Sequence, residues 1–289
     1  MLKDIIKSFR IKQWLKNGFL FAGIIFDGQF FNTDAFFHTA AGFLVFCLLS
    51  SSVYYLNDVF DKEADKQHPI KSIRPIASGR LSVNTAIFIA LLMSFLALSA
   101  AYFLSHIFLI LCFVYLLINI LYSKWLKHIP ILDVMIIAAG FVIRVAAGVS
   151  LIKVERFSPW LYVVTTLLSL FIGFGKRRAE LVLLSKDANR HRIVFNGYSI
   201  PFLDQLITIV SSTTVVSYSL YSFSAPNLPE NHSMMLTIPF VLYGIFRYLY
   251  LIQIEQSGGA PEELVLKDKP LQLSVLCYGI SVLIIFYII

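Results

Sequence analysis

Charged residues are scarce in this sequence: they make up 14% of its 289 residues, whereas 58% are hydrophobic. Soluble globular domains carry about 25% charged residues, so this composition excludes an ordinary soluble domain. Cysteine is also rare, and Cys47, Cys112 and Cys277 lie inside apolar stretches without CxxC spacing. We therefore expect buried structural thiols, and neither disulfides nor a cysteine metal site.

Other familiar patterns are missing as well. The alternating segments of about 10 residues that a transmembrane β-barrel requires are absent. There is no soluble domain, low-complexity tract or clear short repeat. The basic start leads into an apolar span without the small-residue cleavage site of a signal peptide. We expect an all-α, polytopic membrane protein with one integral-membrane domain over residues 1–289 and an interfacial helix within 1–15.

Apolar runs of about 20 residues are abundant, and this is the length of a transmembrane helix. Because the bilayer cannot satisfy backbone polar groups, such spans should be helices. The pattern predicts nine of them, with these bounds: 16–31, 36–56, 84–104, 106–122, 131–151, 160–175, 204–224, 234–253 and 271–289.

Lysine and arginine are distributed unevenly among the loops. If the N-terminus and every second loop share one side, that side holds all of the 24 lysines and arginines except Arg144, Lys153 and Arg156. By the positive-inside rule, the N-terminus is cytoplasmic and the C-terminus external, in a multi-pass protein of the inner (plasma) membrane. The net charge of +7 then reflects topology, and we expect no nucleic-acid partner.

Opposing charges gather directly after the second span, in LNDVFDKEADKQHPIKSIRP. If the helix continues, Asn57, Asp61 and Asp65 fall at i, i+4 and i+8, with Asp58 beside them on the same face. Clustered carboxylates need a neutralising cation, and oxygen ligands suit Mg²⁺, or Mn²⁺ in its place, together with substrate phosphate oxygens. The alternative is a solvated helix end with ion pairs such as Asp58–Lys62.

Cations follow at once in HPIKSIRP. Lys71 and Arg74 can bind phosphate oxygens that the metal does not reach, and arginine does so through a bidentate fork. A positive-inside flank would also account for these two residues. Acids for a metal followed by bases for phosphate are what a diphosphate substrate requires.

These motifs resemble those of a known protein family. NDVFDKEAD fits the NDxxDxxxD motif, and the chain resembles the UbiA superfamily of intramembrane transferases. The resemblance implies a UbiA-like helical bundle with a cytoplasm-facing active site. YSKWLK resembles the family's Tyr/Lys motif, with a spacing one residue longer, which implies substrate binding by Tyr122 and Lys127. The residues that it assigns to Mg²⁺ and the diphosphate are Asn57, Asp58, Asp61 and Asp65.

The chain departs from the family pattern after the sixth span. Most members carry a second aspartate-rich motif there, whereas this chain reads FGKRRAELVLL. Three cations with one carboxylate disfavour a second Mg²⁺ site and suit a free phosphate or phosphomonoester, with a positive-inside flank as the alternative. The substrate-binding residues predicted here are Lys176, Arg177, Arg178 and Glu180.

Together with LKHIPILDV, FVIRVAAG and PEELVLKDKPLQL, these segments resemble the polyprenyl-phosphate phosphoribosyltransferases over roughly residues 10–275. That branch implies phosphoribosyl pyrophosphate (PRPP) as the donor and decaprenyl phosphate, or a similar polyprenyl phosphate, as the acceptor. The lipid phosphate is already an anion that can attack C1 of the ribose. No strong general base is required. This agrees with the sequence, in which the histidines are scattered and none stands out as a catalytic base.

Two charges lie inside predicted spans, and such residues are functional candidates. Asp133 starts the fifth span and can bind ribose hydroxyls or assist the metal, with a helix N-cap as the alternative. Arg144 lies eleven residues later and can meet the acceptor phosphate. Alternatively, Arg144 forms a buried structural pair with an acid.

Three rival functions remain. A UbiA-type aromatic prenyltransferase would use a prenyl diphosphate donor. A transporter would place polar groups near the bilayer midplane, whereas nearly all of them lie at one face here. A catalytically inactive scaffold is disfavoured by the intact acidic set.

Overall fold

The computed structural model describes residues 2–67, 71–154, 158–184, 193–225, 228–257 and 261–288. Every regular element in these ranges is a helix, which confirms the predicted all-α class. The chain divides into two compact units, Met1–Val154 and Glu155–Ile289, each with its own helical packing. The single domain over 1–289 stays a prediction. Arg156 and the basic segment 185–192, which entered the predicted orientation, lie outside the described residues.

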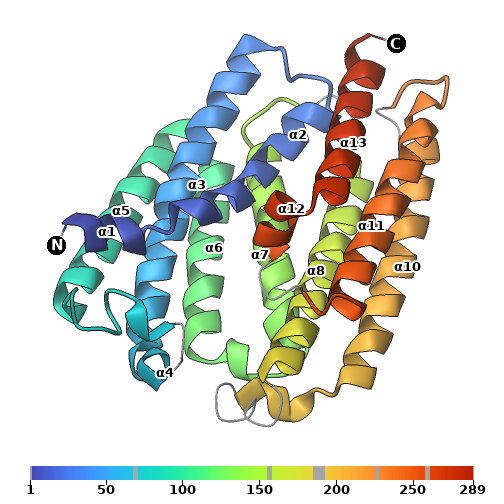
Figure 1. The fold of residues 1–289 in the computed structure, drawn as a ribbon. Helices are drawn as coiled ribbons and strands as arrows, with labels where there is room; N and C mark the ends of the chain where they lie inside the picture. Colours follow the sequence, from blue (N-terminus) through green and yellow to red (C-terminus); the bar gives the residue numbers. More distant parts are fainter. Residues whose placement is uncertain are drawn as a thin grey trace. The chain divides into compact units, whose positions relative to one another are not determined.

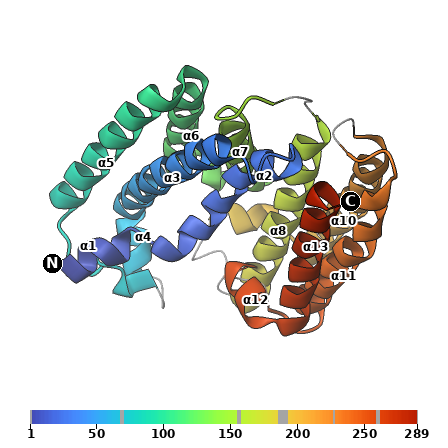
Figure 2. The ribbon, with the colours of Figure 1, turned by 90° about the horizontal axis from the view of Figure 1, so that it is seen from above.

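The first unit is built around the long helix α3. This helix packs against α5, α6 and the N-terminal 3₁₀ helix η1, while α7 packs against α6, η1 and α2 (Figures 1 and 2). The elements of this unit are α1 (Leu2–Ser8), η1 (Ile11–Leu20), α2 (Phe21–Phe26), α3 (Thr33–Phe60), α4 (Lys62–Gln67), η2 (Lys71–Ile73), α5 (Val83–Leu104), α6 (His106–Lys124), η3 (Leu126–His128) and α7 (Leu132–Val149).

The second unit is a bundle in which α8 packs against α10, and α11 packs against α13 and α10 (Figure 1). Arg247 of α11 donates to both carboxylate oxygens of Asp268, the residue that caps α13, at 3.1 and 2.7 Å. This contact holds the pKa of Asp268 below its ordinary value. The elements are α8 (Trp160–Leu184), η5 (Ile193–Gly197), α10 (Ile200–Ser224), η6 (Ser233–Thr237), α11 (Ile238–Gln253), α12 (Pro261–Lys267) and α13 (Lys269–Tyr287).

The helices α3, α5, α6, α10 and α13 begin where a polar residue precedes an apolar run. A side-chain oxygen there accepts a hydrogen bond from a backbone amide of the first turn, which satisfies a donor that the helix leaves free. Ser105 ends α5 and caps α6, so the two helices form a tight hairpin. The residues that cap helices in this way are Asn32, Ser82, Ser105, Ser199 and Asp268.

Seven helical segments of the described chain are long and apolar enough to cross a membrane, which fits a multi-pass protein. The predicted count of nine is not confirmed. The stretch 16–31 is divided between η1 and α2, both shorter than a span. The stretch 160–175 forms the first part of α8, but that helix continues through Lys176, Arg177 and Arg178. These three cations make α8 less apolar than the seven segments.

The interior of the first unit combines apolar and small polar side chains. Phe46, Leu49, Phe108 and Cys112 are buried in one core between α3 and α6. The cysteines are free thiols, with Cys47 and Cys112 buried and Cys277 partly so, as predicted. A short polar run of α3 forms hydrogen bonds with the neighbouring helices. Trp14 of η1 donates to Ser51 Oγ at 3.0 Å, and Ser94 of α5 donates to Ser52 Oγ at 2.9 Å.

Candidate functional site

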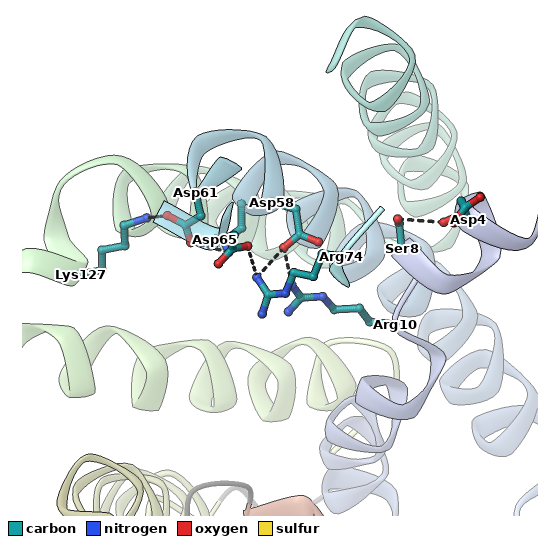
Figure 3. Close-up of polar contacts among 9 residues, drawn as sticks. Asp4, Ser8, Arg10, Asp58, Asp61, Asp65, Arg74 and Lys127 are labelled. Carbon is teal, nitrogen blue, oxygen red and sulfur yellow. Dashed lines mark hydrogen bonds and ion pairs between the residues drawn. The ribbon is translucent and has the colours of Figure 1, made fainter. Parts of the chain in front are cut away.

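The acids of NDVFDKEAD lie at the end of α3 and in α4. The helix of the second span does not continue unbroken through this motif. It is interrupted at Asp61, whose φ of −88° and ψ of 1° fall in the sparsely populated bridge region. The helical spacing nevertheless survives. The Asp61 amide donates to the Asn57 carbonyl at 2.9 Å, and the Asp65 amide donates to the Asp61 carbonyl at 2.7 Å. Asp58, Asp61 and Asp65 are therefore close neighbours along one side of the chain (Figure 3).

Arg74 bridges two of these carboxylates. Its Nη1 donates to Asp58 Oδ1 at 3.0 Å and to Asp65 Oδ2 at 2.6 Å. Asp58 and Asp65 are only 3% and 4% exposed, so each needs a partner to offset the cost of burying its charge. Arg10, from the link between α1 and η1, places a second guanidinium on Asp58 Oδ1 (Figure 3).

Lys127 neutralises the third carboxylate. Its ammonium group, in η3, forms an ion pair with Asp61 Oδ1, and Asn57 Nδ2 donates to Asp61 Oδ2 at 3.0 Å. The structure thereby joins the Tyr/Lys motif to the acidic motif, 66 residues apart in the chain. Tyr122 lies half-buried at the end of α6, close in sequence to this contact.

A solvated helix end does not describe this segment. Asp58 is buried and pairs with arginines, and not with Lys62 as that alternative expected. The exposed side of α4 carries a separate ion pair in which Lys66 donates to Glu63 at 2.8 Å. This pair lowers the pKa of Glu63. The loop thus has an exposed salt bridge and, distinct from it, a buried acid–base cluster.

The donor chemistry of the cluster suits a hard divalent cation, because it offers three carboxylates and the Asn57 amide and no softer ligand. Among the described residues, no three acids converge closely enough to enclose a metal. Their oxygens face Arg10, Arg74 and Lys127 instead. The residue types therefore fit Mg²⁺, and basic side chains supply the neutralising charge in this structure.

Lys71 and Asp133 are two further predicted site residues of the first unit. Lys71 lies in η2, three residues before Arg74, and is half-buried. Asp133 is fully buried in the first turn of α7. It is not the helix N-cap, because that position is occupied by Ile131. Ile131 has a φ of +68°, an unusual conformation for a β-branched residue and one found mainly at functional or strained sites.

Arg144 has neutral partners in place of the acid that was one alternative. Its Nε donates to Asn17 Oδ1, its Nη1 to the Gly140 carbonyl and its Nη2 to the Tyr115 hydroxyl, each at 2.8 Å. Asn17 in turn donates to Ser50 Oγ at 3.1 Å. This buried hydrogen-bond network links η1, α3, α6 and α7. Within the described chain, Arg144 therefore has a structural role at the centre of the network.

Replacing Tyr115 by phenylalanine tests how much the Arg144 network contributes to stability. The change removes one acceptor from a buried guanidinium while keeping the ring that stacks against it, so we expect a loss of about 1.5–3 kcal/mol of stability. Tyr102→Phe is the control, because the Tyr102 side chain is exposed. Thermal unfolding in detergent should separate the two. Equal midpoints would show that Tyr115 contributes no significant hydrogen bond.

The basic segment of the second unit lies inside α8. Arg177 is buried, 2% exposed, and donates to Glu180 at 2.7 Å. Arg178 forms an ion pair with Asp204 of α10 and donates to the Ile252 carbonyl at 2.8 Å. Arg178 thus binds α8 to its neighbours in addition to any contact with substrate. Lys176 precedes them on the same helix, half-buried.

Sequence reasoning missed two participants. Arg10 is one of several cations that precede the first predicted span, and nothing in the sequence distinguishes it from Lys7 or Lys12. Asp204 lies near the start of α10 and belongs to no motif. In both cases the partner lies far away in the chain, 48 residues for Arg10–Asp58 and 26 for Arg178–Asp204. A pattern read along the sequence cannot reveal such pairings.

Comparison with known proteins gives consistent similarities. Residues 18–262 match the model of the UbiA prenyltransferase family. Decaprenyl-phosphate phosphoribosyltransferase of Corynebacterium glutamicum is 31% identical over 289 residues, which covers 98% of this chain and 87% of that protein. The protein of the same name from Mycolicibacterium smegmatis is also 31% identical, with coverages of 96% and 91%.

A solved structure has the same fold. The UbiA homologue from Archaeoglobus fulgidus bound to DMAPP and Mg²⁺ superposes with a TM-score of 0.76 at 17% identity. The match covers 99% of this chain and 100% of that one. The UbiA-like helical fold predicted from the motifs is therefore confirmed.

Proposed function

Since the chain belongs to the UbiA prenyltransferase family, we propose that it transfers the 5-phosphoribosyl group of PRPP to a polyprenyl phosphate. Decaprenyl phosphate or a similar lipid is the acceptor, and diphosphate is released. The observation that carries this proposal is the similarity, over nearly the whole chain, to two proteins named decaprenyl-phosphate phosphoribosyltransferase. The basic segment of α8, where other family members are expected to carry acids, supports it.

The donor diphosphate needs a metal-assisted leaving-group site. Asp58, Asp61 and Asp65 with Asn57 would hold Mg²⁺, or Mn²⁺ in its place; the Archaeoglobus fulgidus homologue binds Mg²⁺ together with a prenyl diphosphate. A bound divalent cation neutralises the negative charge that develops on the departing diphosphate. The residues of the chain would orient the diphosphate so that it leaves C1 on the side opposite the acceptor.

The basic residues of the cluster complete this site. Arg74 and Lys127 lie directly on the carboxylates and can turn to phosphate oxygens of the donor. Asp133, which is fully buried in the first turn of α7, would meet ribose hydroxyls. Phosphate binding by Lys71 and by residues 176–178 stays a prediction.

The transfer step requires little from the protein in acid–base terms. An oxygen of the lipid phosphate forms the new bond to C1 of the ribose, and the bond between C1 and the diphosphate oxygen breaks. The diphosphate takes the electron pair. The nucleophile is already an anion, so no general base is required.

We also propose a cytoplasmic N-terminus, from the positive-inside pattern.

A direct assay tests the proposal. The purified full-length protein is incubated with Mg²⁺, PRPP and a mixture of polyprenyl phosphates, and lipid products are identified by mass spectrometry. We expect phosphoribosylated polyprenyl phosphate and released diphosphate. A parallel reaction contains a prenyl diphosphate and an aromatic acceptor. Diphosphate release only in that second reaction would replace our proposal with the aromatic prenyltransferase.

A further inference from the structure

The acid–base cluster is balanced in charge. Three carboxylates, Asp58, Asp61 and Asp65, are matched by three cations, Arg10, Arg74 and Lys127. The cations come from three separate segments: the link after α1, the loop after η2, and η3. Each of them already occupies a carboxylate oxygen (Figure 3). With these contacts in place, the cluster offers no net negative charge to attract a divalent metal.

A metal therefore competes with the protein's own side chains. A metal that binds Asp58 Oδ1 or Asp65 Oδ2 takes the place of guanidinium groups, because Arg10 and Arg74 already donate to these oxygens. A displaced cation in a partly buried site loses its counter-ion, and breaking such a pair is strongly unfavourable. The arginines can leave more easily than the lysine, because their side chains are 24% exposed and that of Lys127 is 10% exposed.

A diphosphate supplies what the displaced cations need. Its oxygens accept bidentate hydrogen bonds from arginine, and they also bind the metal. On the basis of the proposed function, we propose that Arg10 and Arg74 are exchange residues: they neutralise the carboxylates in the free enzyme and move to the donor diphosphate as the metal enters. The metal and the diphosphate then bind cooperatively, and each binds weakly alone.

Arg10 is placed for this exchange by its backbone. Its φ of 52° and ψ of 51° lie in the left-handed region, which non-glycine residues adopt infrequently. The flanking chain is anchored to α3, because Tyr55 donates to the Ile5 carbonyl at 2.7 Å and Ser51 donates to the Phe9 carbonyl at 2.9 Å. The anchored turn presents the guanidinium to Asp58, so the side chain can change partner without moving the segment.

Metal binding without turnover tests this inference. The full-length protein in detergent is dialysed to equilibrium against buffered free Mn²⁺, with and without inorganic diphosphate. We expect the Mn²⁺ dissociation constant to fall at least about tenfold when diphosphate is present, within the usual range of coupling between sites. By reciprocity, Mn²⁺ should tighten diphosphate binding by the same factor.

Substitution of Arg10 separates exchange from simple bridging of metal and diphosphate. Arg10→Gln removes a competing cation, so Mn²⁺ without diphosphate should bind about fivefold more tightly, and the effect of diphosphate should shrink accordingly. Arg10→Lys should restore values near those of the native protein. Lys12→Gln is the matched control, an exposed residue of η1 with the same change in charge, and should alter neither constant.

Size-exclusion chromatography checks that each variant is folded. Arg74→Gln should shift the Mn²⁺ dissociation constant in the same direction as Arg10→Gln. Unchanged or weaker Mn²⁺ binding by folded Arg10→Gln would overturn the inference. Failure of the proposed function is distinguishable. In that case no phosphoribosylated lipid forms, although Mn²⁺ and diphosphate still bind cooperatively.

Discussion

Replacing Asp61 by asparagine should lower kcat/KM for PRPP by at least about 100-fold, comparable to the loss of a group that stabilises transition-state charge. The carboxylate lies between Asn57 and Lys127 at the point where α3 ends. Asparagine keeps one oxygen that can accept from Lys127, but it removes the negative charge that would hold a divalent metal. Activity should fall while the fold persists.

Asp61 is the informative choice among the three acids. Its side chain is 25% exposed, whereas removing the charge of buried Asp58 would take away the carboxylate that two guanidinium groups share. Instability and lost catalysis would then be confounded. Glu63→Gln is the matched control: it changes the same charge two residues away, on the exposed side of α4, and should keep native activity.

Initial rates at varied PRPP and Mg²⁺ concentrations give the measurement, with thermal unfolding as a check on the fold. Raising the Mg²⁺ concentration should recover part of the Asp61→Asn activity if a weakened metal site is the cause. Native turnover by a folded Asp61→Asn variant would exclude Asp61 from the metal site.

Gly148→Ala should prevent the first unit from packing, with a cost of about 3 kcal/mol or more. A Cβ at this position of α7 would lie 1.9 Å from the Leu20 carbonyl oxygen and 2.7 Å from its carbon. Both are backbone atoms at the end of η1, so no side-chain rotation relieves the clash. Helix α7 would have to separate from η1, which carries Asn17 of the Arg144 network.

Gly279→Ala provides the contrast. It lies in α13, where an added Cβ meets nothing within 4 Å, and alanine favours a helix by up to about 1 kcal/mol over glycine. Fluorescence-detected size-exclusion chromatography should show a normal folded peak for Gly279→Ala and a strongly reduced or aggregated one for Gly148→Ala. Equal peaks and unfolding midpoints would show that η1 and α7 are not in this close contact.

The sequence by itself determined the class of the molecule and most of its chemistry. Apolar runs of span length dictate membrane helices, since the bilayer leaves the backbone no other solution. The spacing of Asp58, Asp61 and Asp65 dictates that they share one side of the chain, and this outcome survived the break at Asp61. Both properties are local, and local periodicity is what a sequence records directly.

Only the tertiary structure decided how the charges pair. The partners of the acids, Arg10, Arg74 and Lys127, come from separate segments, and Arg144 pairs with neutral groups where an acid was one alternative. Close approach at Gly148 likewise depends on a residue more than a hundred positions away. Such contacts arise when helices pack, and the sequence around either partner carries no sign of the other. The opposing charges after α3 are therefore one balanced cluster, completed by distant cations.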